Sequence, residues 1–374
     1  MWFGIFFTFV LLETFIVLVL LLGILRTRRQ ATAVFPSTES GSGLSVVIPF
    51  RNEAERILPL LHSINAAHLP TDLEFIFVDD RSDDRTFSVI GSVLTTPFQL
   101  LKNTGPVGKK GAIQTGVRGA MYPNILTLDA DVSFGADYFI EISTRTGPDM
   151  VILPVAMKQS GVLTFPGAVE FSFLQFAGLG FAALNYPVLC SGANLLFRRS
   201  LFLQVDPLRE DYAIVSGDDV FLLKKFKERK AQIMIDASRA LSVETRTPET
   251  LTALIAQRRR WLSKSWAMNP AFTIVGAGVF VLSQVCGVAL IGGLFSSWLY
   301  LVPLLIKVKT ELVADYFVVR KSLLIRLPLV IFYQALAPVF TLLLLLPIRD
   351  KRWYSPSGES TLLSEEKKGN RTTL

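Results

Sequence analysis

Ile125-Leu126-Thr127-Leu128-Asp129-Ala130-Asp131 is the stretch of the chain that decides its fold. The apolar half predicts a short buried strand, and an Asp-x-Asp triplet follows it directly. Because alternate residues of an extended chain point to the same side, both carboxylates face one way. Such a pair suits a hard divalent cation, Mg²⁺ or Mn²⁺, which binds carboxylate and phosphate oxygens. An aspartate after a strand also caps helices and turns, so the pair takes its meaning from its surroundings.

Similar apolar runs lie before and after this strand. They cover Leu44 to Ile48, Glu74 to Val78 and Met150 to Pro154, and the stretches between them are long enough for helices. Alternating strands and helices predict an α/β domain with a largely parallel sheet and helices on both faces. Ligands of such domains bind beyond the carboxyl ends of the strands. Acidic residues that directly follow a strand are therefore candidates for the site.

The composition indicates a membrane protein. Hydrophobic residues make up 51% of the 374 residues, which is too apolar for an ordinary soluble protein. The net charge of +7 comes from basic residues that gather beside apolar runs, as they do in membrane proteins, so we expect no nucleic-acid partner. Two cysteines, Cys190 and Cys286, are too few for a disulfide framework and predict a reducing compartment.

The first membrane signal is the apolar run from Trp2 to Leu25, in which Glu13 is the one charged residue. The run is long enough to cross a hydrocarbon core of about 30 Å at about 1.5 Å per residue. The basic residues that follow it predict a cytosolic location for the next part of the chain. We therefore expect an integral protein of the cell or inner membrane, with an anchor over 1–25, a linker over 26–43 and a cytosolic catalytic domain over 44–245.

The chain becomes apolar again after a predicted interfacial region over 246–270. Transmembrane or interfacial helices are expected over 271–347, and a polar tail over 348–374. Three crossings would put the basic start of this tail outside the cell, whereas an interfacial middle segment, Trp298 to Val319, would keep it cytosolic. A further run, Phe165 to Leu184, is short for a span and predicts an interfacial or groove-lining helix.

Polar residues follow two more of the predicted strands. Asp79 and Asp80 come directly after the strand at 74–78, where Asp80 can accept a hydrogen bond from a nucleotide base. The residues from Ser82 to Asp84 fit turn and cap chemistry. Glu53 comes shortly after the first strand and is expected at the same edge of the sheet.

Lys109 belongs to a glycine-rich segment, GPVGKKG, over Gly105 to Gly111. The segment is not a Walker A loop, because position 103 is Asn and Lys110 takes the Ser/Thr position. A lysine among glycines can still contact a diphosphate as a point charge. The alternative is a solvated turn that opens a helix.

Two later segments carry groups suited to catalysis. Asp218 and Asp219 precede an apolar helical run, where they either cap the helix or act as a general base on an acceptor hydroxyl. In inverting transfer such a base lies on the sugar face opposite the leaving group. Gln257, Arg260 and Trp261 share one face of a predicted helix. There Arg260 can bind phosphate, and Trp261 can bind a sugar or lipid. The alternative is that both residues are interfacial membrane anchors.

Taken in order, these segments resemble the motifs of glycosyltransferase family 2, the inverting enzymes with a GT-A fold, and in particular its membrane-integrated branch. The motifs here are VVIPFRNE, VDDRSDD, GKKGA, LDAD, SGANLLFRRS, SGDD and QRRRW, and they extend from Val46 to Trp261. The resemblance implies an enzyme that binds a UDP- or GDP-sugar and Mg²⁺ or Mn²⁺ and transfers the sugar to a lipid or glycan acceptor at the membrane.

The resemblance also implies a role for individual residues. On the donor side, nucleotide binding is implied for Asp79, Asp80 and Lys109, with Glu53 on the same side, and metal and diphosphate binding for Asp129 and Asp131. On the acceptor side, Gly192, Ala193 and Asn194 would form a loop, and Asp219, with Asp218 beside it, would take the proton. Gln257, Arg260 and Trp261 would close over diphosphate and acceptor.

The chain departs from the family pattern in two motifs. Asp218 stands where the family has Glu, and Arg81 stands where Gly is common. The chain has fewer membrane segments than the large channel-forming synthases, which favours a short or lipid acceptor. The alternatives are a processive polysaccharide synthase and a non-catalytic membrane scaffold that binds sugar nucleotides.

Overall fold

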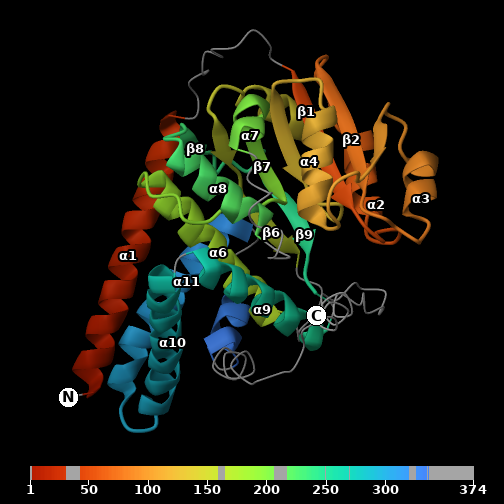
Figure 1. Cartoon of the computed structure of the whole chain (residues 1–374). Coiled ribbons are helices and arrows are strands. Elements are labelled where there is room, and N and C mark those ends of the chain that lie inside the picture. The colour runs from red at the N-terminus through yellow and green to blue at the C-terminus, as the bar shows by residue number, and fades with distance from the viewer. Residues whose placement is uncertain are drawn as a thin grey trace, which may run out of the picture.

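The computed structural model describes residues 2–30, 43–158, 165–205, 217–248, 250–268, 270–319, 326–334 and 336. Figure 1 shows a sheet domain in the upper part of the view and a group of long helices that extends below it.

The domain is built on a sheet of seven described strands in the order β3-β2-β1-β4-β7-β5-β8. Parallel pairing joins β1 to β2 and β4, β2 to β3, and β5 to β8, whereas β7 is antiparallel to both of its neighbours. A second sheet pairs β6 with β9 in parallel. The bounds are Leu44–Phe50 (β1), Leu73–Asp79 (β2), Gln99–Lys102 (β3), Asn124–Leu128 (β4), Met150–Ile152 (β5), Val155–Lys158 (β6), Asn194–Arg198 (β7), Ile233–Ile235 (β8) and Val243–Arg246 (β9).

The helices cover both faces of this sheet and continue beyond it (Figure 1). A further helical stretch covers 326–334. The named helices are Trp2–Gln30 (α1), Leu58–Asn65 (α2), Thr86–Val93 (α3), Lys109–Gly119 (α4), Tyr138–Ser143 (α5), Phe165–Ala183 (α6), Arg199–Val205 (α7), Asp218–Glu228 (α8), Leu251–Met268 (α9), Pro270–Gly293 (α10), Trp298–Tyr300 (η1, a 3₁₀ turn) and Leu301–Val319 (α11).

Alternation along the strands produces a separate core on each face of the sheet. In β1, Val46 and Ile48 face a core that includes residues of α2, α3 and α5. Val47 faces a second core that includes residues of α4, α6, α7 and α8. This second core also takes in α1 and the end of α11, so the long helices and the sheet domain share buried apolar side chains. The predicted α/β class with a largely parallel sheet is therefore confirmed.

Two described helices are long and apolar enough to cross a membrane, Trp2–Thr27 within α1 and Gly276–Gly293 within α10. The predicted linker over 26–43 begins too early, because α1 continues to Gln30. The middle C-terminal segment forms η1 and α11, and Lys307, Lys309, Glu311 and Asp315 interrupt its apolar character. Residues 31–42 of the predicted linker, residues 337–347 and the predicted tail lie outside the described residues.

Contacts between the long helices fix their relative directions. The Phe3 and Tyr300 rings lie 5.3 Å apart, and farther along both helices the hydroxyls of Thr14 and Thr310 lie 3.0 Å apart, so α1 and α11 run the same way. α6 lies between these helices and the sheet (Figure 1). A β-carbon on Gly180 would lie 2.7 Å from the Leu20 side chain, so a small residue is needed where α6 meets α1.

Candidate active site

Lys109 links two other residues predicted for the site. Asp129 follows the end of β4, and Lys109 is the first residue of α4. The Lys109 Nζ lies 2.6 Å from Asp129 Oδ1 and 3.4 Å from Asp218 Oδ2. Burial lowers the pKa of Lys109, but Asp129 and Asp218 outweigh burial and raise this pKa above its ordinary value. One ammonium group therefore joins the Asp-x-Asp pair to the start of α8.

A buried aspartate holds the backbone in front of Lys109. Gly108 is the N-cap residue of α4 and has a φ of 116°, which residues with a side chain rarely adopt. Its N–H donates to Asp80 Oδ2 at 2.7 Å, and Asn103 Nδ2 donates to Asp80 Oδ1 at 2.6 Å. Asp80 is 3% exposed, and burial raises its pKa. Asp80 thus shapes the glycine-rich turn that opens α4, while its predicted contact with a nucleotide base stays a prediction.

The residues after Asp80 form the predicted turn and cap. Asp79 Oδ1 accepts from the Ser82 N–H at 2.8 Å, and Asp84 Oδ1 accepts from the Thr86 N–H at 3.0 Å where α3 begins. Arg81 has a φ of 63°, in the left-handed region that favours glycine. This conformation explains why Gly is common at this position of the motif, and why Arg81 is a departure with a cost in backbone strain.

Asp131 and Glu53 lie on the acidic side of the same edge. Asp131 Oδ2 accepts from Thr245 Oγ1 at 3.2 Å, and burial raises the Asp131 pKa with a further contribution from Asp129. Glu53 Oε1 pairs with Arg56 at 2.7 Å, whereas Glu53 Oε2 is buried and accepts no hydrogen bond from the described part of the chain. Burial raises the pKa of Glu53 to about 7; Arg56 opposes this shift, and the carboxylates of Asp131 and Asp129 add to it.

These carboxylates fit a divalent cation that is completed by other ligands. Asp129 and Asp131 supply oxygens, and Glu53 Oε2 is a buried oxygen without a donor. Among the described residues, no three His, Cys, Asp or Glu side chains form a metal site by themselves. Mg²⁺ needs only one or two protein carboxylates when water and substrate phosphates supply the rest. The residues present therefore suit a metal that arrives with a diphosphate.

The raised pKa of Glu53 gives a first prediction. Between pH 4.5 and about 7 the folded protein keeps a proton on Glu53 that the unfolded chain has lost. As the pH rises through this interval, the contribution of Glu53 to the free energy of unfolding falls by about 3 kcal/mol. We expect Glu53→Gln to flatten the profile of melting temperature against pH in detergent with EDTA. The exposed neighbour Glu55→Gln is the control, and equal slopes for Glu53→Gln and the wild type would contradict the prediction.

The predicted acceptor-side loop contacts the two acids at the start of α8. The Gly192 N–H donates to Asp219 Oδ2 at 3.2 Å, and the Val220 N–H donates to Asp219 Oδ1 at 2.8 Å. A β-carbon on Gly192 would lie 2.7 Å from Asp218 Oδ2 and 3.3 Å from Lys109 Nζ. A side chain at this position would therefore displace the Asp218 carboxylate. Both acids lie in the first turn of α8, whose N-cap residue is Gly217, so neither acid takes the N-cap position that the capping interpretation predicts. Their position beside Lys109 suits catalysis.

Asn194 occupies a different position from Gly192. Its side chain is fully buried, with Nδ2 donating to Pro154 O at 2.9 Å and Leu241 O at 2.8 Å. Its Oδ1 accepts from the Tyr138 hydroxyl at 2.6 Å. Asn194 therefore supports the loop from within the domain, and Ala193 is also buried. Tyr138 was not predicted as part of the site, because its partner Asn194 is distant along the chain.

The motif at Gln257 to Trp261 lies on α9 and is held against α6. Arg258, which is 2% exposed, donates to Gln257 Oε1 at 2.8 Å and to Glu170 Oε2 at 2.6 Å. Its guanidinium lies 4.2 Å from the Trp261 ring centre, and the Trp261 ring packs on Phe171. Arg258, for which the motif predicted no role, thus contacts Gln257 and Trp261, the first and last residues of the motif. Burial lowers the pKa of Arg260.

Loss of this guanidinium gives a second prediction. Arg258→Met leaves the Glu170 carboxylate buried without its cation, which typically costs about 3–5 kcal/mol of unfolding free energy. We expect a lower melting temperature in detergent. Addition of Glu170→Gln to Arg258→Met should restore most of the loss, because the uncompensated charge is then absent. Equal melting temperatures for the single and double variants would show that the ion pair is not the cause.

The central part of the chain is similar to a known protein family. Residues 45–205 match Glycosyl transferase family 2. The match includes Glu53, Asp80, Lys109 and the Asp-x-Asp pair, and it ends before Asp218 and α9. Together with the observed sheet, it supports the predicted class of an α/β, GT-A domain flanked by long apolar helices.

More specific similarities cover less of the chain or are more distant. The 4,4'-diaponeurosporenoate glycosyltransferases of Staphylococcus aureus, strains USA300 and Newman among them, are 39% identical over 93 residues. The chain spans 24% of the length of these relatives, and the similarity covers 24% of this chain.

Two solved structures resemble the chain over most of its length. The mannosyltransferase PcManGT from Pyrobaculum calidifontis in complex with GDP-Man and Mn²⁺ is 17% identical, with a TM-score of 0.48 and coverage of 89% of this chain and 99% of its own. S. aureus TarS 1-349 in complex with UDP is 16% identical, with a TM-score of 0.41 and coverage of 81% and 90%.

Proposed function

We propose that the protein is a membrane-bound inverting glycosyltransferase, which moves a hexosyl or N-acetylhexosaminyl group from a UDP- or GDP-sugar to a lipid or glycan acceptor at the cytosolic membrane face. The contact of Lys109 with both Asp129 and Asp218 carries the proposal. Through this contact a single lysine side chain joins Asp129, which suits a leaving diphosphate, to Asp218, which lies beside the proposed base. The family match over residues 45–205 supports the same activity.

The donor side is formed by the ends of three parallel strands. Asp80 and the turn at Gly108 contribute the nucleotide end, and Glu53, Asp129 and Asp131 contribute the diphosphate end. A divalent cation held by Asp129 and Asp131 would supply charge neutralisation for the departing diphosphate. Lys109 neutralises Asp129, and the same ammonium is available to a phosphate oxygen as a point charge.

The acceptor side is formed by Gly192 and the first turn of α8. Asp219 takes the proton from the acceptor hydroxyl as the acceptor oxygen bonds to the anomeric carbon and the bond from that carbon to the diphosphate oxygen breaks. The attack comes from the face opposite the diphosphate, so the configuration inverts. The N–H groups of Gly192 and Val220 orient the Asp219 carboxylate. Gln257, Arg260 and Trp261 on α9 close over diphosphate and acceptor.

A lipid acceptor agrees with the long apolar helices α1 and α10. It also agrees with the partial S. aureus relatives, whose name describes a glycosyltransferase of 4,4'-diaponeurosporenoate. The proposed membrane position therefore serves to bring the soluble donor to an acceptor that stays in the bilayer.

The test is incubation of membranes that contain the protein with labelled UDP- and GDP-sugars and with Mg²⁺, Mn²⁺ or EDTA. We expect label from one donor in a lipid or short glycan, dependent on metal and lost in an Asp129→Ala variant. A long polymer would favour the processive synthase instead. Nucleotide binding without transfer to any extract would favour the non-catalytic scaffold.

A further inference from the structure

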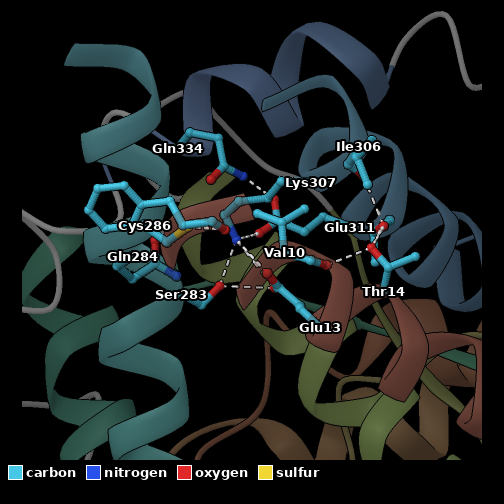
Figure 2. A network of polar contacts seen from close by, with 12 residues as sticks. Val10, Glu13, Thr14, Ser283, Gln284, Cys286, Ile306, Lys307, Glu311 and Gln334 are labelled. Atoms are coloured by element: carbon cyan, nitrogen blue, oxygen red, sulfur yellow. Dashed lines mark hydrogen bonds and ion pairs between the residues drawn. The ribbon is translucent and has the colours of Figure 1, made fainter. Parts of the chain in front are cut away.

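Lys307 is the centre of a buried polar network outside the active site, and Figure 2 shows its residues. The Lys307 Nζ donates to Ser283 Oγ at 2.6 Å, to Glu311 Oε1 at 2.7 Å and to Glu13 Oε2 at 3.2 Å. Gln334 donates to the other oxygen of Glu311. One ammonium group therefore contacts α1, α10 and α11 directly and reaches the 326–334 helix through Glu311.

Positive charge and hydrogen-bond donors are scarce in this network. Lys307 is fully buried, and its side chain faces two carboxylates, with Glu13 20% and Glu311 7% exposed. The Oε1 atoms of Gln284 and Gln334 are buried and accept no hydrogen bond within the described part of the chain. Arg326, the next cation, is engaged bidentately by Asp315. Within the described residues, Arg326 is therefore committed to Asp315, and Lys307 is the cation that faces Glu13 and Glu311.

The surrounding helices are shaped to admit the network. A β-carbon on Gly287 would lie 2.7 Å from Gln334 Oε1 and 3.4 Å from Lys307 Cε, so a side chain there would displace the Gln334 amide. Glu13 lies about 17 Å along the helix axis from Trp2, near the middle of the apolar run of α1. In a bilayer spanned by α1, the network lies near the midplane.

Helix α11, which carries Lys307, continues from the network into the catalytic domain. Ala314, Phe317 and Val318, in the second half of α11, belong to the core beneath the sheet. The Phe317 ring packs on Phe176 of α6, 5.9 Å between centres. Leu20 and Ile24 of α1 belong to the same core, so the Lys307 network and this core together set the height of the domain relative to the anchor.

We propose that Lys307 is a positioning residue for transfer to a membrane-embedded acceptor; this rests on the proposed function. The acceptor's depth is fixed by the bilayer, and the depth of the acids at the active site is fixed by α1 and α11. Lys307 keeps these two helices in register. Since a shift of about 1 Å at reacting groups can cost about a hundredfold in rate, the register determines how well a bilayer acceptor is used.

The test compares Lys307→Met with Lys309→Met, which removes an exposed charge two positions along the same helix. We expect Lys307→Met to lower kcat/KM for an acceptor in vesicles about ten- to a hundredfold. Nucleotide binding and transfer to a short-chain acceptor in detergent should be unchanged, and Lys309→Met should match the wild type throughout. Equal losses on both acceptors, or none, would overturn the proposal.

A second variant covers the case in which Lys307→Met fails to fold. Glu13→Leu removes only the link to α1 and leaves Lys307 and Glu311 as a neutral pair. The same difference between vesicle and detergent acceptors is expected, and wild-type behaviour would overturn the proposal.

A third measurement needs no enzyme activity. In a chain with the native cysteines replaced, Thr14→Cys and Thr310→Cys should form a disulfide readily, because the two hydroxyls lie 3.0 Å apart. Addition of Glu13→Leu should slow this reaction, and an unchanged rate would show that the network does not hold the register. If the wild type transfers no sugar, the proposed function fails, while the disulfide reaction still decides the role of the network.

Discussion

Asp219→Asn is expected to lower transfer to the acceptor by about 10²–10⁴-fold while nucleotide binding stays measurable. The amide has nearly the shape of the carboxylate but cannot take the proton of the acceptor hydroxyl. It keeps one of the two hydrogen bonds that the carboxylate accepts from the Gly192 and Val220 N–H groups. The measurement is single-turnover transfer with saturating donor, together with a melting temperature to show that the domain is folded.

Asp218→Asn is the matched control, because it removes the same charge one position earlier in the first turn of α8. Asp218 lies 3.4 Å from Lys109, so its loss should chiefly affect the donor side. A larger loss of turnover from Asp218→Asn would move the base to Asp218. Near-normal turnover of both variants would leave the two acids with a capping role alone.

Asp131→Ala is expected to lower kcat/KM by about 10²–10³-fold, through weaker donor binding in the presence of metal. The carboxylate is one half of the proposed metal pair, so its removal should weaken donor binding with Mg²⁺ or Mn²⁺ and have little effect with EDTA. Calorimetric titration with the nucleotide diphosphate, with and without metal, measures the difference.

Thr245→Val separates the charge of Asp131 from its support. It removes the hydroxyl that donates to Asp131 at 3.2 Å and leaves the carboxylate in place. A small effect on metal-dependent binding is expected. Metal dependence in Asp131→Ala equal to that of the wild type would refute the assignment of the pair.

Periodicity and strand-end chemistry were sufficient to predict the sheet edge. The four apolar runs of the sequence correspond to β1, β2, β4 and β5, and Lys109, Asp129 and Asp218 do meet beyond the strands. The run over 150–154 is shorter as a strand, because Leu153 and Pro154 separate β5 from β6. The reversed strand β7 was not predicted, since direction depends on pairing with distant strands and leaves no periodic signal.

The supporting residues of the site also escaped prediction. The sequence showed Asn103 only as a departure from a phosphate-loop motif, whereas in the structure its Nδ2 donates to Asp80 Oδ1 at 2.6 Å. Arg258 occupies an unspecified place in its motif, and Glu170 lies 88 positions away in sequence. Glu13 stood out as the one charged residue of the first apolar run, but the sequence did not identify Lys307 as its partner. Pairs of this kind depend on which helices become neighbours, and a single sequence does not record that.

The distance in sequence between Glu13 and Lys307, 294 positions, also bears on how the chain is made. During synthesis α1 emerges long before α11, so in the proposed membrane arrangement Glu13 first meets lipid without its ammonium partner, at a cost of about 2.5 kcal/mol or more. Insertion of the first helix is therefore provisional until the C-terminal helices arrive. Chains arrested before Lys307 should be extracted from membranes and degraded more readily than complete chains, and Glu13→Leu should abolish that difference in a pulse-chase measurement.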